Sequence, residues 1–168
     1  MSVIKRNNVL AHFKNLFQPN TIEAALAIAS YLHRGVKDKG GVPYICHPLW
    51  IYSKLSAKCE PLEVLNTSIL HDVYEDTEVT LTELAEWFSP TVCDAVDALS
   101  RREGEDRADY IRRVAKDPIA RKVKKEDLRH NLDITRLKNR HNMSEKDLAR
   151  IKCYGAEYDL LVGGAVGI

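Results

Sequence analysis

A short segment in the middle of the chain carries four ionisable residues among apolar ones. The pair His71 and Asp72 follows Ser-Ile-Leu, and Glu75 and Asp76 come four residues after them. Residues four apart lie on the same side of a helix, so a helix through this segment would stack the two acids beside the pair. Ionisable groups in an apolar helix are costly unless something compensates them. A metal ion beside the helix would compensate His71 and Asp72.

The alternative for this segment is structural. A core histidine with a satisfied hydrogen bond and a solvated acidic face would explain it at least as well if it stood alone. Two distant segments, however, offer matching groups: His47 in PYICHPL and Asp127 in KKEDLRHNLD. Two imidazoles and two carboxylates suit manganese or iron and leave positions for water and substrate. A zinc site built from thiolates is not indicated.

The segments that carry these residues have the spacing of helices. Apolar residues recur at helical intervals, and a capping residue or a proline precedes most segments. We expect helices over residues 21–33, 47–58, 61–76, 80–87, 90–100, 108–117, 119–137 and 144–161. The glycine-rich and charged residues 34–43 are expected to form a loop. No stretch alternates as a strand would, so the predicted fold class is all-α.

Length and composition indicate one globular domain. The chain has 168 residues, and 45% of them are hydrophobic. We expect one domain over residues 1–168, with its core over about 20–162 and frayed ends at about the first ten residues and at 163–168.

The charge balance and the cysteines bear on partners and location. A formal net charge of +1 offers no global attraction for nucleic acid or for an anionic membrane. No apolar run reaches the roughly 20 residues that span a bilayer. The four cysteines contain no Cys-x-x-Cys pair, and no secretory segment is recognised. We therefore expect a cytoplasmic protein that binds neither nucleic acid nor a membrane.

Three segments carry a resemblance to a known family: YLHRGVKDKGGVPYICHPL, SILHDVYEDT and KKEDLRHNLD. In order and spacing they resemble the hydrolase domain of the Rel/Spo stringent-response family, over about residues 22–137 and more loosely beyond. That family belongs to the HD superfamily of helical metal phosphohydrolases and removes the 3′-diphosphate from the alarmone ppGpp. The resemblance implies an HD-type helical bundle with a central metal site, similar to the small single-domain hydrolases.

The resemblance implies a role for each matched residue. The metal ligands of the family fall on the four residues that the residue types already select: His47, His71, Asp72 and Asp127. The pair that handles the attacking water and its proton falls on Glu75 and Asp76. The asparagine near the ribose falls on Asn131, and a basic residue that faces the phosphates falls on Lys39.

The implied cofactor is a divalent metal ion, taken to be Mn²⁺. Such an ion makes water more acidic and polarises the phosphoryl oxygen under attack, and a carboxylate with a raised pKa then takes the proton. The side chains that could hold the phosphates are Lys37, Lys39, Lys124 and Arg129. The alternative for these cations is an ordinary solvated loop or helix face. His33 and His130 are candidates to orient the metal ligands.

Two positions depart from the family and concern the substrate. Asp38 stands where the long alarmone hydrolases have an arginine that stacks on guanine, a contact that an acid cannot make. Ile134 stands where they have a threonine that contacts the nucleotide, although Thr135 is adjacent. The sequence therefore predicts a ppGpp 3′-pyrophosphohydrolase and leaves two alternatives: an HD phosphohydrolase of another nucleotide or nucleotide cofactor, and a non-catalytic nucleotide-binding regulator. A homodimer is compatible with a small helical domain.

Overall fold

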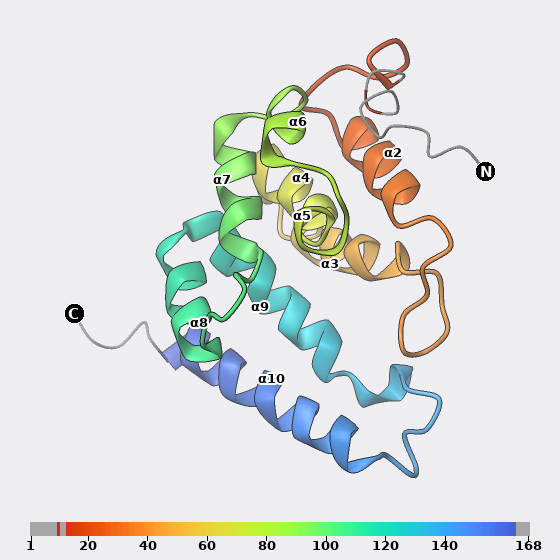
Figure 1. Ribbon diagram of the computed structural model, residues 1–168, viewed down its shortest axis with the longest axis vertical. Coiled ribbons are helices and arrows are strands. Elements are labelled where there is room, and N and C mark those ends of the chain that lie inside the picture. The colour runs from red at the N-terminus through yellow and green to blue at the C-terminus, as the bar shows by residue number, and fades with distance from the viewer. Residues whose placement is uncertain (1–9, 11–12, 164–168) are drawn as a thin grey trace.

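The computed structural model describes residue 10 and residues 13–163, and in this part of the chain it consists of helices joined by loops (Figure 1). The helices are α2 (Ile22–Leu32), α3 (Cys46–Ser56), α4 (Leu62–Leu70), α5 (Val73–Asp76), α6 (Leu81–Ala85), α7 (Pro90–Leu99), α8 (Arg107–Lys116), α9 (Pro118–Leu132), the 3₁₀ turn η1 (Ile134–Arg136) and α10 (Glu145–Gly163). The described residues form no strand, only an isolated bridge between Lys37 and Pro43. The predicted all-α class is confirmed.

The helices begin where the sequence signals predict. The Thr21 side chain accepts the Ala24 amide at the start of α2, and Thr80 and Glu83 form a complete capping box at the start of α6. Asp106 and Asp117 accept backbone amides in the first turns of α8 and α9. These side chains satisfy amides that have no partner inside a helix, so local sequence sets the helix starts.

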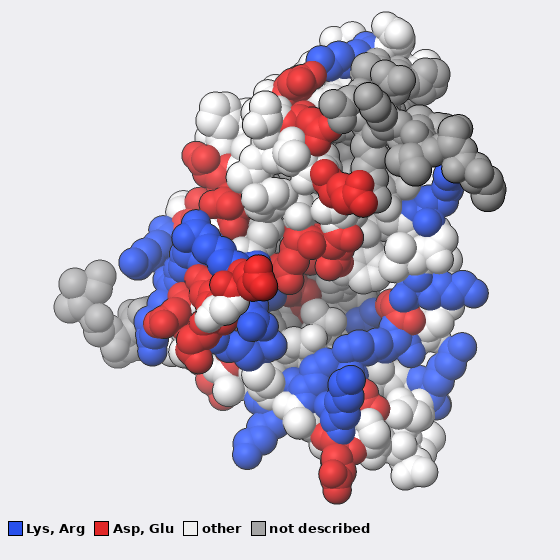
Figure 2. Space-filling model, in the orientation of Figure 1, with Lys and Arg blue, Asp and Glu red and all other residues white. Residues whose placement is uncertain are grey.

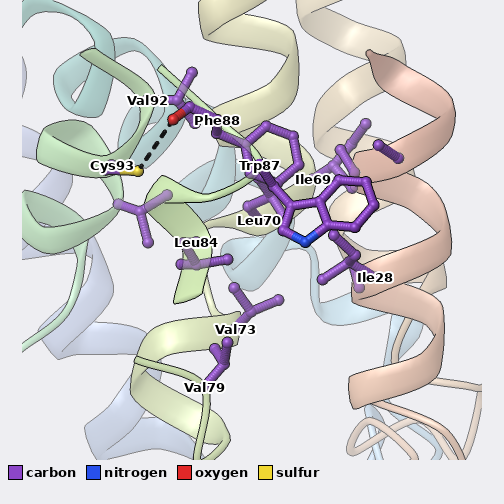
Figure 3. Packing of buried hydrophobic residues seen from close by; sticks show 14 of the residues in the cluster. Ile28, Ile69, Leu70, Val73, Val79, Leu84, Trp87, Phe88, Val92 and Cys93 are labelled. Carbon is purple, nitrogen blue, oxygen red and sulfur yellow. Dashed lines mark hydrogen bonds between the residues drawn. The ribbon is translucent and has the colours of Figure 1, made fainter. Parts of the chain in front are cut away.

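The core of the described residues consists of two clusters, and both α4 and α7 contribute to each of them. In the first cluster, Trp87 is 1% exposed and lies among Ile28 of α2 and Ile69 of α4 (Figure 3). The second cluster contains Val64 of α4 and Leu128 of α9, together with side chains of α3, α7, α8 and α10. Burying one such side chain contributes about 1.5–3 kcal/mol. Because α4 contributes to both clusters, its C-terminal end is held firmly against the rest of the molecule.

Helix α9 lies at the centre of the second cluster. It packs against α3, α4, α7, α8 and α10, and α10 runs beside it along most of its length (Figure 1). The residues predicted to bind metal come from α3, from the end of α4 and from α9. The packing of these three helices against one another therefore brings distant parts of the sequence to one place.

The helix expected over residues 61–76 is interrupted, so that prediction is wrong at one point. Helix α4 ends at Leu70 and α5 begins at Val73, with His71 and Asp72 between them. The ring nitrogen Nδ1 of His71 lies 2.9 Å from the carbonyl oxygen of Ser68, the acceptor that a continued helix would offer to the amide of Asp72. A side chain thus competes with the backbone for one acceptor, and the pair stands at a helix break.

The helix expected over residues 119–137 is also shorter than predicted. Helix α9 ends at Leu132, and Asp133 begins the separate turn η1 by accepting the amide of Thr135 on its side chain. An aspartate that bonds the backbone two residues on favours a turn over a continued helix. The chain therefore changes direction here and leads to α10.

The predicted fraying of the ends falls mostly outside the described residues. Leu10 is described and is buried in the first cluster, and Gly163 is described as the last residue of α10. The single-domain organisation stays a prediction. Across residues 10 and 13–163, none of the helices combines the length and the apolar character that a membrane-spanning segment needs.

Candidate metal centre

The four predicted metal ligands come together at the junction of α3, α4 and α9. Nε2 of His47 lies 3.3 Å from Nε2 of His71, 3.1 Å from Oδ1 of Asp127 and 3.6 Å from Oδ2 of Asp72. Ligand atoms of His47, His71 and Asp127 all lie within 4.8 Å of one another, and these three residues are buried. A group of this size and composition fits one divalent ion.

His71 is held in a form that suits a metal ligand. Since the Ser68 carbonyl can only accept, Nδ1 of His71 donates to it, and Nε2 points at the cluster, 2.8 Å from Oδ2 of Asp72. Burial alone would lower the pKa of His71, but the Asp72 carboxylate raises it to about 9. Burial likewise opposes the charge of Asp72, yet the His71 imidazole keeps the pKa of that carboxyl far below its usual range. Without a metal, a proton shared by this pair occupies the place of the cation.

Asp127 is ionised and held from two sides. Lys124 donates to Oδ2 at 2.9 Å, and the amide of Asn131 donates to Oδ1 at 2.6 Å. Burial would raise the pKa of Asp127, but Lys124 and His47 hold it well below its usual range. Lys124 and Asn131, predicted as substrate contacts, therefore lie in the site and bind the ligand residue Asp127.

Of the two histidines predicted to orient ligands, His130 contacts one directly. Its Nδ1 lies 2.6 Å from Nδ1 of His47, with the two ring planes within 10° of each other, and Trp50 stacks on a face of the His130 ring. Burial, followed by Arg136 and His47, lowers the pKa of His130 to about 4. His33 packs against the ring of Tyr44, and its Nε2 is buried with no hydrogen-bond partner in the described structure.

Tyr44 belongs to the site and was missed by sequence reasoning. Its hydroxyl donates to Oδ2 of Asp72, and its ring lies 5.7 Å from that of His47. Burial and the Asp72 carboxylate raise the pKa of Tyr44 well above its usual value, so the hydroxyl keeps its proton and remains a donor. The available signal was its position in the loop that leads to His47.

Glu75 and Asp76 stand at the mouth of the site on the short helix α5. Both are exposed and both line the cavity beside the cluster, and Oε2 of Glu75 accepts the amide of Arg101 at 2.8 Å. Partial burial, with the nearby carboxylates of Asp72 and Glu75, raises the pKa of Asp76 to about 6. A carboxylate with such a pKa can accept a proton near neutral pH.

The cluster forms one wall of a cavity of about 490 Å³. On the face shown in Figure 2, acidic side chains gather above a central hollow and basic ones below it and to its sides. The cations that line the cavity are Lys37, Lys39, Arg101, Arg107, Lys124, Arg136 and Arg150. Arg129, predicted as a substrate contact, does not line it and instead pairs with Glu126.

The four arginines of this wall were missed by the sequence analysis. Each comes from a different segment, and none belongs to a recognised motif. Three of them are fixed by carboxylates: Arg107 pairs with the buried Glu157, Arg136 with Asp38, and Arg150 lies 2.9 Å from Asp147. Basic side chains held in place beside a cavity suit an anionic ligand.

Asp38 has a structural role that could not be predicted from the sequence. One carboxylate oxygen accepts the amide of Val42 at 2.9 Å, and the other accepts from Arg136 at 2.6 Å. Arg136 also donates to the carbonyl of His130 at 2.8 Å. Asp38 therefore fixes the loop 37–43 and holds Arg136 in the cavity wall.

Sequence comparisons place relatives among proteins of ppGpp metabolism. No family model matches the chain. The chain is 33% identical over 142 residues to a GTP pyrophosphokinase of Streptomyces coelicolor, which covers 79% of this chain and 17% of that protein. It is 31% identical over 144 residues to a guanosine-3′,5′-bis(diphosphate) 3′-pyrophosphohydrolase of Spiroplasma citri. This match covers 77% of this chain and 19% of that protein. The chain thus spans about one-fifth of the length of these relatives.

A comparison with solved structures agrees on the fold. A metazoan ortholog of SpoT, described as hydrolysing ppGpp, superposes with a TM-score of 0.70 over 84% of this chain and 85% of its own, at 24% sequence identity.

A helical bundle that joins an adjacent His–Asp pair to a second histidine and a second aspartate defines an HD-type protein. Within that class, the chain is similar to the Rel/Spo proteins, as the sequence resemblance predicted.

Proposed function

We propose that this protein is a metal-dependent phosphohydrolase that removes the 3′-pyrophosphate of ppGpp, giving GDP and pyrophosphate. The observation that carries the proposal is the meeting of His47, His71, Asp72 and Asp127 in the wall of a cavity that is lined by cations on its other side. The names of the relatives agree with this activity. A cavity with a metal centre on one side and basic side chains on the other suits a polyphosphate substrate.

The residues present fit a divalent metal ion. His71 keeps Nε2 available because Nδ1 is engaged with Ser68, and Asp127 is ionised. Two imidazoles and two carboxylates favour manganese or iron over a structural zinc site, and we propose Mn²⁺. When bound, such an ion acidifies water and polarises a phosphoryl oxygen.

The remaining chemistry belongs to side chains of this protein. Asp76 accepts the proton from the attacking water, since its pKa of about 6 lies near neutral pH. Glu75, bonded to the amide of Arg101, shares the same edge of the cavity. Lys37 and Lys39 neutralise the phosphates on the opposite wall.

A direct test is pyrophosphate release from ppGpp by the purified protein with added Mn²⁺. We expect turnover that falls by a factor of about 100 or more in Asp72→Asn and Asp76→Asn, because each removes a group that acts in the reaction. Arg112→Gln, which removes an exposed charge on α8 away from the cavity lining, is the matched control. Turnover that survives Asp72→Asn would contradict the proposal.

Asp38 favours a second candidate, hydrolysis of another phosphorylated nucleotide or nucleotide cofactor. Its carboxylate accepts hydrogen bonds from the amide of Val42 and from Arg136, and an acidic side chain supplies no cation to stack on a guanine base. A panel of nucleotides assayed beside ppGpp separates the two candidates. Tight ppGpp binding without turnover of any member would instead support a non-catalytic regulator.

A further inference from the structure

We infer that His130 is a positioning residue for the metal centre: it accepts the proton on Nδ1 of His47, so that Nε2 of His47 presents its lone pair to the metal ion. The inference rests on the metal site of the proposed function and concerns a residue outside the predicted ligand set. It follows from the contact between the two imidazoles.

The geometry restricts where the protons lie. The two Nδ1 atoms are 2.6 Å apart, and such a contact needs one donor and one acceptor. Nε2 of His47 faces the other ligands, 3.1 Å from Asp127 and 3.3 Å from Nε2 of His71. A neutral imidazole that binds metal through Nε2 carries its proton on Nδ1. His130 must then be the acceptor and carry its own proton on Nε2.

His130 differs from the other groups that hold the metal ligands in this site. Nδ1 of His71 faces a carbonyl oxygen, which fixes its tautomer in every state. His130, in contrast, can donate or accept. A metal ion on Nε2 of His47 would set the proton on Nδ1 of His47 and make His130 the acceptor.

The surroundings keep His130 in the required place. Its ring stacks on that of Trp50, with centroids 4.4 Å apart, and meets the ring of His47 edge to edge and nearly coplanar, with centroids 4.9 Å apart. Its carbonyl accepts from Arg136, and the residue is 5% exposed. Because stacking on Trp50 and the backbone both hold it, the ring keeps Nδ1 directed at His47.

Two substitutions separate the hydrogen bond from the packing. His130→Phe keeps an aromatic ring stacked on Trp50 but removes the acceptor that faces His47. His130→Asn places an amide oxygen at the same bond separation from the backbone as Nδ1 and restores it. We expect His130→Phe to weaken binding of Mn²⁺ and Zn²⁺ by about 10- to 100-fold in calorimetry, and His130→Asn to recover most of that affinity.

A spectroscopic measurement tests the proton positions directly. In protein labelled with ¹⁵N-histidine, we expect the proton of His47 on Nδ1 and that of His130 on Nε2 when Zn²⁺ is bound. His141→Phe, which replaces an exposed histidine away from the cavity lining, is the control and should retain metal affinity.

The outcomes are distinguishable from failure of the proposed function. Normal metal affinity in His130→Phe, or a proton on Nδ1 of His130 in the zinc-loaded protein, would overturn the inference and leave the metal site standing. Equal losses in the Phe and Asn variants, with unchanged thermal unfolding of both metal-free proteins, would also overturn it. A wild-type protein that binds no divalent ion would overturn the proposed function and the inference together.

Discussion

Single residues behind the ligands decide how the metal centre is held. Asp72 is fixed by the hydroxyl of Tyr44, Asp127 by Lys124 and Asn131, and His71 by a backbone carbonyl. Each contact presets the orientation or the charge of a ligand before any metal arrives. Such partners commonly matter almost as much as the ligands themselves.

Tyr44→Phe tests one of these contacts. The variant keeps the ring beside His33 and His47 but leaves Asp72 without its hydroxyl donor. We expect Mn²⁺ affinity to fall by about 10-fold or more, with little change in the unfolding temperature of the metal-free protein. Titration of the metal by calorimetry checks the first expectation, and thermal unfolding checks the second. Wild-type affinity in this variant would show that the contact is incidental.

The raised pKa of Asp76 predicts an acidic limb in the pH profile. A base must be deprotonated to act, so activity should rise with pH as Asp76 ionises. Its pKa of about 6 applies to the metal-free protein, and a bound cation favours the ionised form, so the midpoint in kcat/KM should lie at or below about pH 6. Asp76→Asn should remove the limb along with most activity. A limb centred well above pH 6 would assign proton transfer to another group.

The ligand residues were predictable at this scale, and their supports were not. His71 and Asp72 stand out because ionisable groups are costly in an apolar helix unless something compensates them. His47 and Asp127 were found as matching ligand types in two segments that resemble those of the family. Tyr44 has no such signal, since an aromatic residue in a loop fits ordinary packing equally well. Its role depends on a contact made across the fold.

Among the elements, the loop of residues 34–45 and the turn η1 form one unit across the cavity. Asp38 of the loop bonds Arg136 of the turn. Gly40 brings the two backbones close, because a Cβ atom there would lie 2.6 Å from the carbonyl oxygen of Arg136. The conformations of the loop and of the turn η1 therefore depend on each other.

Gly40→Ala should force these two elements apart. We expect a loss of about 1–3 kcal/mol in the free energy of unfolding, the range for added atoms in tightly packed places. Gly155→Ala is the matched control, since it lies within α10 with nothing near the added carbon and should stabilise the protein slightly. Urea unfolding of both variants checks the prediction. A neutral Gly40→Ala would mean that the loop moves freely away from Arg136.

Helix starts were readable from sequence, whereas two helix ends were not. The capping residues Thr21, Thr80, Asp106 and Asp117 act locally, so a short window of sequence contains the whole signal. The break at His71 arises from a side chain that takes a backbone acceptor, although the apolar spacing continues through it. Periodicity alone cannot detect such competition.

For the whole molecule, the metal ion and one buried proton compete for the same place. The pKa of His71 is raised from 6.5 to about 9, so the charged pair with Asp72 stabilises the metal-free fold below about pH 6.5, and this contribution is lost as pH rises through 9. Metal binding needs the deprotonated imidazole and should strengthen over the same range.

Thermal unfolding with EDTA and with Mn²⁺ tests this competition. Between about pH 6.5 and pH 9, we expect the contribution of His71 to make the EDTA-treated protein less stable with rising pH, and the gain from Mn²⁺ to grow. Metal at 100 times its Kd should add about 2.7 kcal/mol. His71→Ala should lose both trends. If Mn²⁺ raised the stability by the same amount at about pH 6.5 and at about pH 9, the assignment of His71 as a ligand would be contradicted.

The cavity wall shows the limit of sequence reasoning for the molecule as a whole. Lys37 and Lys39 were found because they lie in a recognised segment, and both line the cavity. Arg101, Arg107 and Arg150 line it too, but they meet only because the residues after α7, the start of α8 and the first half of α10 come together in the fold. No single segment of sequence holds that information.

The row of rings formed by Trp50, His130 and His47 has an optical consequence. The chain contains two tryptophans, and the other, Trp87, is 1% exposed and belongs to the first core cluster, whereas Trp50 packs against the second. The fluorescence of Trp50 should respond to metal binding at His47 and to protonation of the two histidines, whereas that of Trp87 should stay constant. Native fluorescence thus offers a label-free reporter of ion uptake in real time, with a Trp50→Phe variant to subtract the background.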